Sequence, residues 1–172
     1  VLATRRARVL DTLRAEPGSN TYKLALEAYD CLPLEFLLPA QHEDVSRLVA
    51  RTVAAAELGR TEVASVADPA NRSFFVSVAL PRRTYEERFR AEIDELLERR
   101  YGASRIDHRS SFLDEDLALV HFFCACDDEL APDTLSSLED EVRARVEPWE
   151  ARFESALAGT TLEELAAHRV QV

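Results

Sequence analysis

The chain has little glycine, and its few glycines are far apart. Only four occur among 172 residues, at Gly18, Gly59, Gly102 and Gly159. A loop that cradles phosphate groups needs closely spaced glycines, because its backbone N–H groups must approach the oxygens. The chain also lacks a Gly-x-Ser-x-Gly nucleophile elbow and a His-Glu-x-x-His zinc pair. The sequence therefore predicts no catalytic, cofactor-binding or metal site in this chain.

Positive charge is scarce too: 21 Lys and Arg stand against 32 Asp and Glu, for a formal net charge of −11. Nucleic acids and anionic membrane surfaces are bound by clustered Lys and Arg, so we expect neither as a partner. No hydrophobic run approaches the roughly 18 residues of a membrane span, and no secretion signal is present. Three cysteines, an odd number, favour a cytoplasmic protein over a disulfide-bonded secreted one.

Methionine is absent altogether, and the chain begins at Val1. We therefore expect it to be part of a longer protein. The last residues support this expectation, because Thr161 and Glu164 have the spacing of a capping box that opens a new helix. Residues 159–172 are predicted to begin a following element that is cut short.

Alternating hydrophobicity predicts four β-strands. Residues 61–67 and 73–80 alternate with a period of two around a turn that contains proline and asparagine, which predicts a β-hairpin. A second pair of strands is predicted near 104–109 and at 117–126. The last of these is apolar on both faces, as expected of a central strand.

Two helices complete this pattern. Helical spacing of apolar residues predicts a helix over 84–101, with Thr84 and Glu87 as its capping box and Gly102 as its C-terminal cap. A last helix is predicted over 132–159, kinked by an internal proline. The order is then ββαββα. Since each helix has one apolar stripe, both should pack on the same face of a four-stranded antiparallel sheet, an α+β ferredoxin-like sandwich.

A helical segment, residues 1–58, is predicted to precede this α/β domain of residues 59–158. Helices are expected at its start, after a cap at Asn20, and over 43–58, with an apolar connector at 34–38. Two helices on one face leave the other face of the sheet uncovered. We expect the helical segment to pack there, and any remaining apolar surface to drive assembly.

Four arginines form one candidate contact site: Arg82, Arg83, Arg88 and Arg90 gather at the start of the predicted helix 84–101. They could be a solvated face that pairs with neighbouring carboxylates. They could instead contact an anion or a protein partner, helped by the helix N-terminus.

The predicted strand 117–126 carries three further residues with possible chemistry. Cys124 and Cys126 fall on one strand face, but a closed zinc site needs four ligands, so we favour buried, inert thiols. His121 lies on the other face. We favour a hydrogen-bonded core histidine over a catalytic base, because no nucleophile is predicted beside it.

A set of residues between Gly18 and Leu157 has an order and spacing that resemble a known family. The set comprises Gly18-Ser19, Tyr22-Lys23, Pro33, Phe36, Arg72, Ser77, Pro81-Arg82, Tyr85, Arg90, Ile93, Leu117-Ala118, His121-Phe122 and Trp149. The pattern resembles the ACT-like N-terminal region of the large, single-gene class of bacterial NAD-specific glutamate dehydrogenase. The chain departs from that family at Arg83-Thr84, where Asp-Arg is common, and at Leu119, where arginine is usual.

The resemblance implies an ACT-like fold and a non-catalytic module for regulation and oligomer contacts. Its partners would be other domains or subunits of the parent enzyme, and a homo-oligomer is expected. The parent would interconvert L-glutamate and 2-oxoglutarate plus ammonia with NAD as cofactor. The residues that bind glutamate and NAD would lie outside this chain, which itself would hold no cofactor.

Two other functions remain open. An amino-acid effector could bind between paired ACT-like sheets, but such sites usually need a glycine-bearing loop, and both strand-to-helix loops here, 81–83 and 126–132, lack glycine. An RNA-binding ferredoxin-like domain would need exposed aromatic residues within a basic sheet. Phe74 and Phe75 are candidates for those aromatics, but the acidic charge balance opposes this function.

Overall fold

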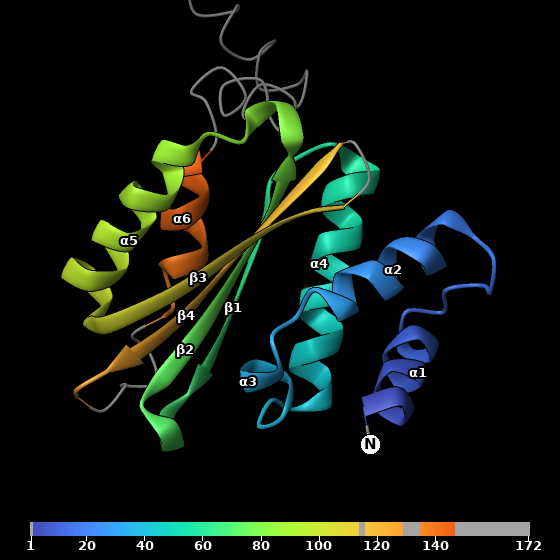
Figure 1. The fold of residues 1–172 in the computed structure, drawn as a ribbon, viewed down its shortest axis with the longest axis horizontal. Coiled ribbons are helices and arrows are strands. Elements are labelled where there is room, and N and C mark those ends of the chain that lie inside the picture. Colours follow the sequence, from blue (N-terminus) through green and yellow to red (C-terminus); the bar gives the residue numbers. More distant parts are fainter. Residues whose placement is uncertain (1, 114–115, 129–134, 147–172) are drawn as a thin grey trace, which may run out of the picture.

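The computed structural model describes residues 2–113, 116–128 and 135–146, which form three layers. A four-stranded sheet lies between α1–α4 on one face and α5 and α6 on the other (Figure 1). The elements in chain order are α1 (Leu2–Thr12), α2 (Asn20–Asp30), α3 (Leu34–Leu37), α4 (His42–Leu58), β1 (Glu62–Asp68), β2 (Ser73–Pro81), α5 (Glu87–Tyr101), β3 (Ala103–Leu113), β4 (Leu117–Cys126) and α6 (Leu138–Val146). The predicted last helix is helical only from Leu138, since residues 135–137 form a turn, and its parts at 132–134 and 147–159, like the element at 159–172, lie outside the described residues.

All neighbouring strands of the sheet are antiparallel, in the order β1-β2-β4-β3. β2 and β4 are therefore central, and the apolar faces of residues 117–126 predicted this position for β4. The ββαββα order and the antiparallel sheet confirm the α+β, ACT-like ferredoxin-like fold class.

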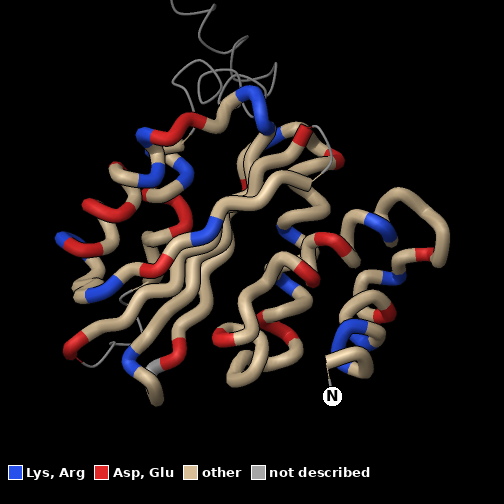
Figure 2. The backbone as a smooth tube through the Cα atoms, in the orientation of Figure 1, with Lys and Arg blue, Asp and Glu red and all other residues tan. Residues whose placement is uncertain are grey.

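The sheet separates two hydrophobic cores, one under each helical layer. Because side chains alternate along a strand, β2 supplies Phe75 to the core under α1–α4, and Phe74 and Val76 to the core under α5 and α6. Figure 2 shows charged residues mainly on the helices and towards the strand ends, while the two central strands are nearly free of them. Both faces of the central strands are thus buried.

α4 is the main support of the N-terminal layer. Its residues Val45, Leu48 and Val49 are buried against the sheet. Gly59 follows the helix at a φ of 61°, a left-handed conformation that glycine adopts without steric strain. The sequence predicted this helix and its glycine cap to within one residue.

α2 and α3 differ in detail from the sequence-based expectation. The side chain that caps α2 belongs to Ser19, whose hydroxyl accepts a backbone N–H at 3.1 Å, and Asn20 is the first helical residue instead. The apolar connector 34–38 contains the one-turn helix α3. Phe36 in α3 stacks on Phe75 of β2, with ring centroids 4.2 Å apart, so this connector is held on the sheet.

The start of α5 contradicts the predicted capping box. Thr84 belongs to a 3-10 turn, Arg82–Thr84, where its hydroxyl donates to the carbonyl of Pro81 at 2.7 Å. α5 begins at Glu87, and no side chain caps it. The threonine hydroxyl is engaged by its own turn and is not available to the helix.

β3 runs from Ala103 to Leu113, well beyond the predicted 104–109, and pairs along the whole of β4. It is an edge strand, and polar side chains such as Arg105, Asp107 and Arg109 occupy much of it. Charged residues are common on edge strands, where they discourage pairing with other chains. They also obscure the hydrophobic alternation, which explains why the prediction was too short.

Carboxylates secure the opposite edge of the sheet. Glu139 of α6 accepts the backbone N–H of Ser65 in β1 at 2.8 Å and pairs with Arg47 of α4 at 3.1 Å. Glu62 of β1 pairs with Arg51 of α4 at 2.7 Å. The edge strand β1 is thus linked to both helical layers, and the Ser65 N–H is not free to pair with another strand.

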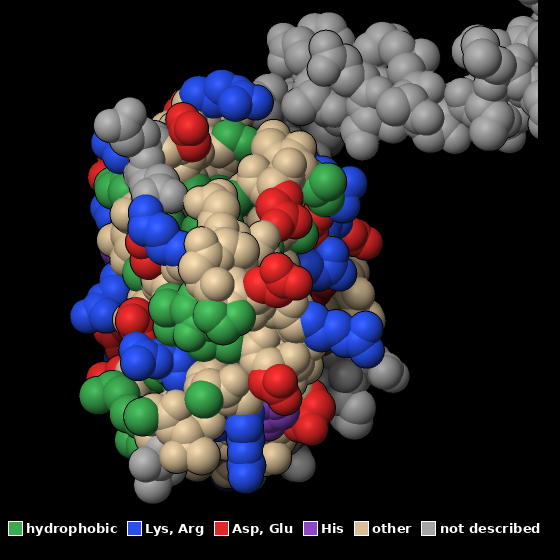
Figure 3. Space-filling view, turned by 90° about the vertical axis from the view of Figure 1, so that its right-hand side faces the viewer, with side chains coloured by type: hydrophobic (Ala, Val, Ile, Leu, Met, Phe, Trp, Pro, Cys, Tyr) green, Lys and Arg blue, Asp and Glu red, His purple; other side chains and the backbone are tan. Residues whose placement is uncertain are grey.

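The outer face of the N-terminal layer mixes charges of both signs around a small cluster of hydrophobic side chains (Figure 3). Across the described ranges, the large hydrophobic side chains that remain exposed are Leu34, Leu38, Leu58 and Phe112. None of the helices described is long and apolar enough to cross a lipid bilayer.

Candidate functional site

The structure divides the predicted arginine site into two parts. Arg88 pairs with Glu86 at 2.6 Å, and Arg90 pairs with Glu87 at 3.1 Å, so their charges are met by close neighbours in the sequence. Arg82 and Arg83 lie in the 3-10 turn and are exposed. The anion or partner contact stays a prediction, and these two arginines are the ones that remain open to it.

Arg82 belongs to a small exposed patch at the β3 edge. Its guanidinium lies over the ring of Phe112, 4.4 Å from the ring centroid, and Tyr85 meets the same ring edge-on at 5.5 Å. Phe112 is 47% exposed although it is aromatic. Arginine and aromatic side chains are enriched at protein interfaces, so the Arg82–Phe112 patch has the composition of a contact surface.

The two thiols of β4 are not equivalent. Cys124 is fully buried, and burial raises the pKa of its thiol far above the ordinary value. Cys126 is only half-buried, so the prediction that both are buried is right for Cys124 alone. The described ranges contain no group of three or more His, Cys, Asp and Glu that could hold a metal ion.

His121 is the most unusual polar residue in the structure. It is 2% exposed and packs at 5.2 Å, ring centroid to centroid, against Phe75. Neither ring nitrogen has a hydrogen-bond partner among the described residues, so the predicted hydrogen-bonded core histidine is wrong in that respect. Burial, followed by the nearby Arg109, lowers the pKa of His121 to about 3, which keeps the ring neutral at physiological pH.

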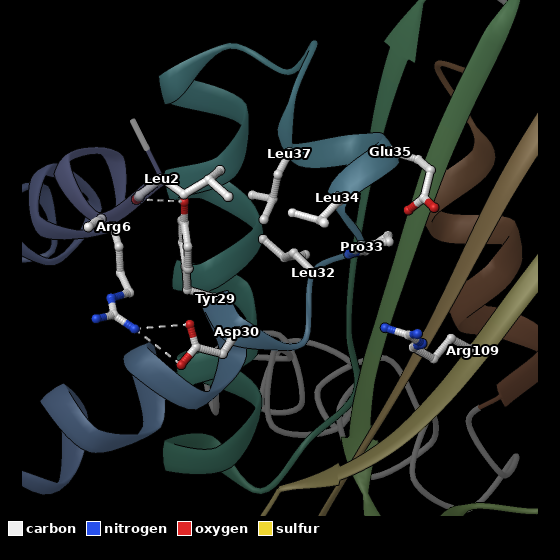
Figure 4. A pocket seen from close by; sticks show the side chains of 11 residues that line it. Leu2, Arg6, Tyr29, Asp30, Leu32, Pro33, Leu34, Glu35, Leu37 and Arg109 are labelled. Atoms are coloured by element: carbon white, nitrogen blue, oxygen red, sulfur yellow. Dashed lines mark hydrogen bonds and ion pairs between the residues drawn. The ribbon is translucent and has the colours of Figure 1, made fainter.

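His121 lines a cavity of about 270 Å³ between the start of α3 and the sheet. The other lining residues are Pro33, Glu35, Phe75, Arg105, Asp107, His108, Arg109 and Phe123. A second cavity, of about 470 Å³, shares Pro33, Glu35 and Arg109 with the first and extends towards α1 and α2. Its remaining wall includes the apolar residues Leu32, Leu34 and Leu37 (Figure 4). The two cavities therefore meet at Glu35 and Arg109.

Glu35 and Arg109 come from opposite walls. Glu35 extends from α3 and Arg109 from β3 into the space between these elements (Figure 4). Neither forms an ion pair or a hydrogen bond within the part of the chain that the structure describes. In the second cavity Arg6 and Asp30 do pair, at 3.3 Å, so the charges there are already satisfied.

Sequence reasoning missed Arg109 and Glu35. Arg109 is the pairing partner of His121 across β3 and β4, which places the two side chains on one face. The sequence could have pointed to Arg109 only through its pairing with His121 on the neighbouring strand. The predicted strand 104–109 was too short to give the correct register between the two strands.

Comparison with known families gives one match, and it covers the part of the chain that forms the sheet. Residues 63–150, just over half of the chain, match the family described as glutamate dehydrogenase, ACT2 domain. No curated protein matches the chain. The matched segment contains β2, β3, β4, α5, α6 and all of β1 except Glu62, which are the elements of the ferredoxin-like sandwich. The chain therefore belongs to the glutamate dehydrogenase ACT2-domain family and is an ACT-like region of a glutamate dehydrogenase.

Proposed function

We propose that this chain is a non-catalytic module for regulation and subunit assembly in a large, NAD-specific bacterial glutamate dehydrogenase. The family match over residues 63–150 carries the proposal. The partners would be other domains or subunits of the same enzyme, in a homo-oligomer, and NAD would bind elsewhere in that enzyme. The cytoplasm is the proposed compartment, since all three cysteines are free thiols.

The surface of the chain supports a role in protein–protein contacts better than a role in catalysis. The Arg82–Phe112 patch combines an exposed aromatic ring with an arginine that has no carboxylate partner in the described ranges. Burial of such a pair in an interface would remove apolar area from water and leave the guanidinium free to meet a carboxylate. We assign this patch to contacts within the parent enzyme.

The purified chain should have no dehydrogenase activity. Its sequence contains no closely spaced glycines for a dinucleotide phosphate, and the chemistry is proposed to lie in another part of the enzyme. The measurement is NADH absorbance in the presence of L-glutamate and NAD, with an active glutamate dehydrogenase added as the positive control. Glutamate-dependent NADH formation that co-purifies with the chain would refute the non-catalytic role.

Effector binding is the second candidate function, and one observation favours it. The two cavities meet at a carboxylate and a guanidinium that have no partners in the described ranges. RNA binding loses support, because Phe74 and Phe75, the aromatics that could have stacked on bases, are both buried.

A further inference from the structure

We propose that the α3 segment, residues 33–40, is a pH-sensitive conformational switch that opens locally when His121 binds a proton. The structure shows the closed state, in which α3 lies on the sheet. Opening would expose the face of the sheet around Phe75 and His121 while the rest of the fold stays intact. The inference goes beyond the assembly and effector roles and depends on neither.

The α3 segment forms the cover over His121. Phe36 of α3 stacks on Phe75 of β2 at 4.2 Å, and Phe75 packs against His121 at 5.2 Å, both between ring centroids. Pro33 and Glu35 line the cavity beside His121, and all its other lining residues belong to the sheet. With this cover in place, His121 is 2% exposed. We therefore expect water to reach the ring by displacement of α3.

The closed structure disfavours a proton on His121. Both ring nitrogens are buried without a hydrogen-bond partner in the described ranges, whereas a protonated imidazole has two N–H donors to satisfy. Burial disfavours the charged ring and the nearby Arg109 adds a like charge, which together lower the pKa of His121 to about 3. Once exposed to water, the ring would regain its ordinary pKa of about 6.5. Proton uptake below that pH therefore favours the open state.

The charged groups around the ring do not supply the missing partners. β2 and α4 present uncharged residues to this face, such as Ser77, which pairs with His121, and Val45. The charged and titratable groups that line the cavity from β3 and α3 are Arg105, Asp107, His108, Arg109 and Glu35. Arg105 and Asp107 pair with each other at 3.5 Å. Glu35 faces Arg109 across the cavity, and no hydrogen bond joins it to His121 (Figure 4).

The α3 segment is the part of the N-terminal layer that should open at the lowest cost. α3 is a single turn of four residues, and a helix this short is not stable by itself. Its buried side chains are Phe36 and Leu37, whereas Leu34 and Leu38 are 55% and 70% exposed. Arg5 of α1 donates to two backbone carbonyls of the segment. Local opening thus breaks few contacts compared with unfolding of the whole chain.

Hydrogen exchange of the complete 172-residue chain tests the switch. NMR at pH 5.0 and 7.0 gives the protection of each amide relative to an unstructured peptide. The probes are the amides of Leu37 and Ala40, which donate to the carbonyls of Pro33 and Phe36 in the closed segment. If the exposed histidine titrates at its ordinary pKa, their protection should fall about 25-fold from the higher to the lower pH.

The amide of Ile93 in α5 is the reference within the same protein, because α5 packs on the opposite face of the sheet. It should be better protected than Leu37 and Ala40 at both pH values, since its exposure needs a larger opening. Protection of the two α3 amides that does not change with pH would overturn the proposal, because opening would then involve no proton uptake. Protection equal to that of Ile93 would overturn it too, because the opening would not be local.

Variants identify the group that binds the proton. His121→Phe keeps a ring but binds no proton, so the protection of Leu37 and Ala40 should become nearly independent of pH. His108→Gln is the control, because His108 is exposed and its removal should leave the pH dependence in place. A fall that persists in His121→Phe, or disappears in His108→Gln, would refute the role of His121. The comparison of α3 with α5 needs no variant, so it decides the proposal even if a variant fails to fold.

Discussion

Replacing Phe75 with alanine should lower the free energy of unfolding by about 3–5 kcal/mol, because a large buried ring is deleted and leaves a cavity. Phe75 is 2% exposed, and its ring contacts both Phe36 of α3 and His121 of β4 on this face of the sheet. Its ring stacks on Phe36 at 4.2 Å. Loss of this ring therefore weakens the attachment of the N-terminal layer as well as the core itself.

Urea unfolding of the Phe75→Ala variant at neutral pH measures this effect, and Phe112→Ala is the matched control. Phe112 is 47% exposed and contacts Arg82 and Tyr85 at the surface, so its removal should cost about 1 kcal/mol or less. Similar losses in the two variants would mean that Phe75 does not join the helical layer to the sheet.

Acidification should destabilise the protein through His121. The pKa of His121 is about 3 in the folded protein and near the ordinary 6.5 in the unfolded chain. The unfolded chain therefore takes up the proton first as the pH falls. Stability from this residue is complete above pH 6.5 and declines towards pH 3. Between pH 6.5 and 5 the loss should be on the order of 2 kcal/mol, at about 1.4 kcal/mol per pH unit.

The measurement compares urea unfolding at pH 5.0 and 7.0 for the native protein and for His121→Phe. The variant cannot bind the proton, so the part of the pH dependence that comes from His121 should disappear. His108→Gln is the control, because His108 is exposed and its removal should leave that dependence in place. The same loss of stability in His121→Phe as in the native protein would show that His121 is not the titrating group.

The sheet could be predicted from the sequence because its signals are local. The alternation of residues 73–80 and the apolar run at 117–126 are properties of a single strand, and burial on both faces follows from them. Gly59 and Gly102 marked helix ends for the same reason, since both adopt a left-handed conformation there.

Features for which several local partners compete could not be fixed from spacing alone. Thr84 has the spacing of a helix cap, but the turn after β2 uses its hydroxyl instead. For the four arginines, pairing with neighbouring carboxylates was one of two predicted alternatives, and the structure shows it for Arg88 with Glu86 and for Arg90 with Glu87. Competing local partners decide such cases, and sequence spacing alone does not rank them.

The candidate ligand site was beyond sequence analysis altogether. Glu35 lies in the helical segment and Arg109 on the edge strand, and only the packing of α3 onto the sheet brings them to one cavity. His121 was recognised as buried, but its lack of a hydrogen-bond partner follows from what surrounds it in space. Sequence patterns indicate which face of a strand or helix a residue occupies. They do not indicate which side chains from other elements lie opposite that residue.

The oligomeric mass of the parent enzyme tests the proposed assembly role most directly. Residues 2–146 would be replaced by a flexible Gly-Ser linker, so that both helical layers and the sheet, which share two cores, are removed together. Light scattering then gives the mass of the particle beside that of the intact enzyme. An assembly module predicts that the shortened enzyme forms a smaller oligomer than the intact one. The same number of subunits in both would contradict the assembly role.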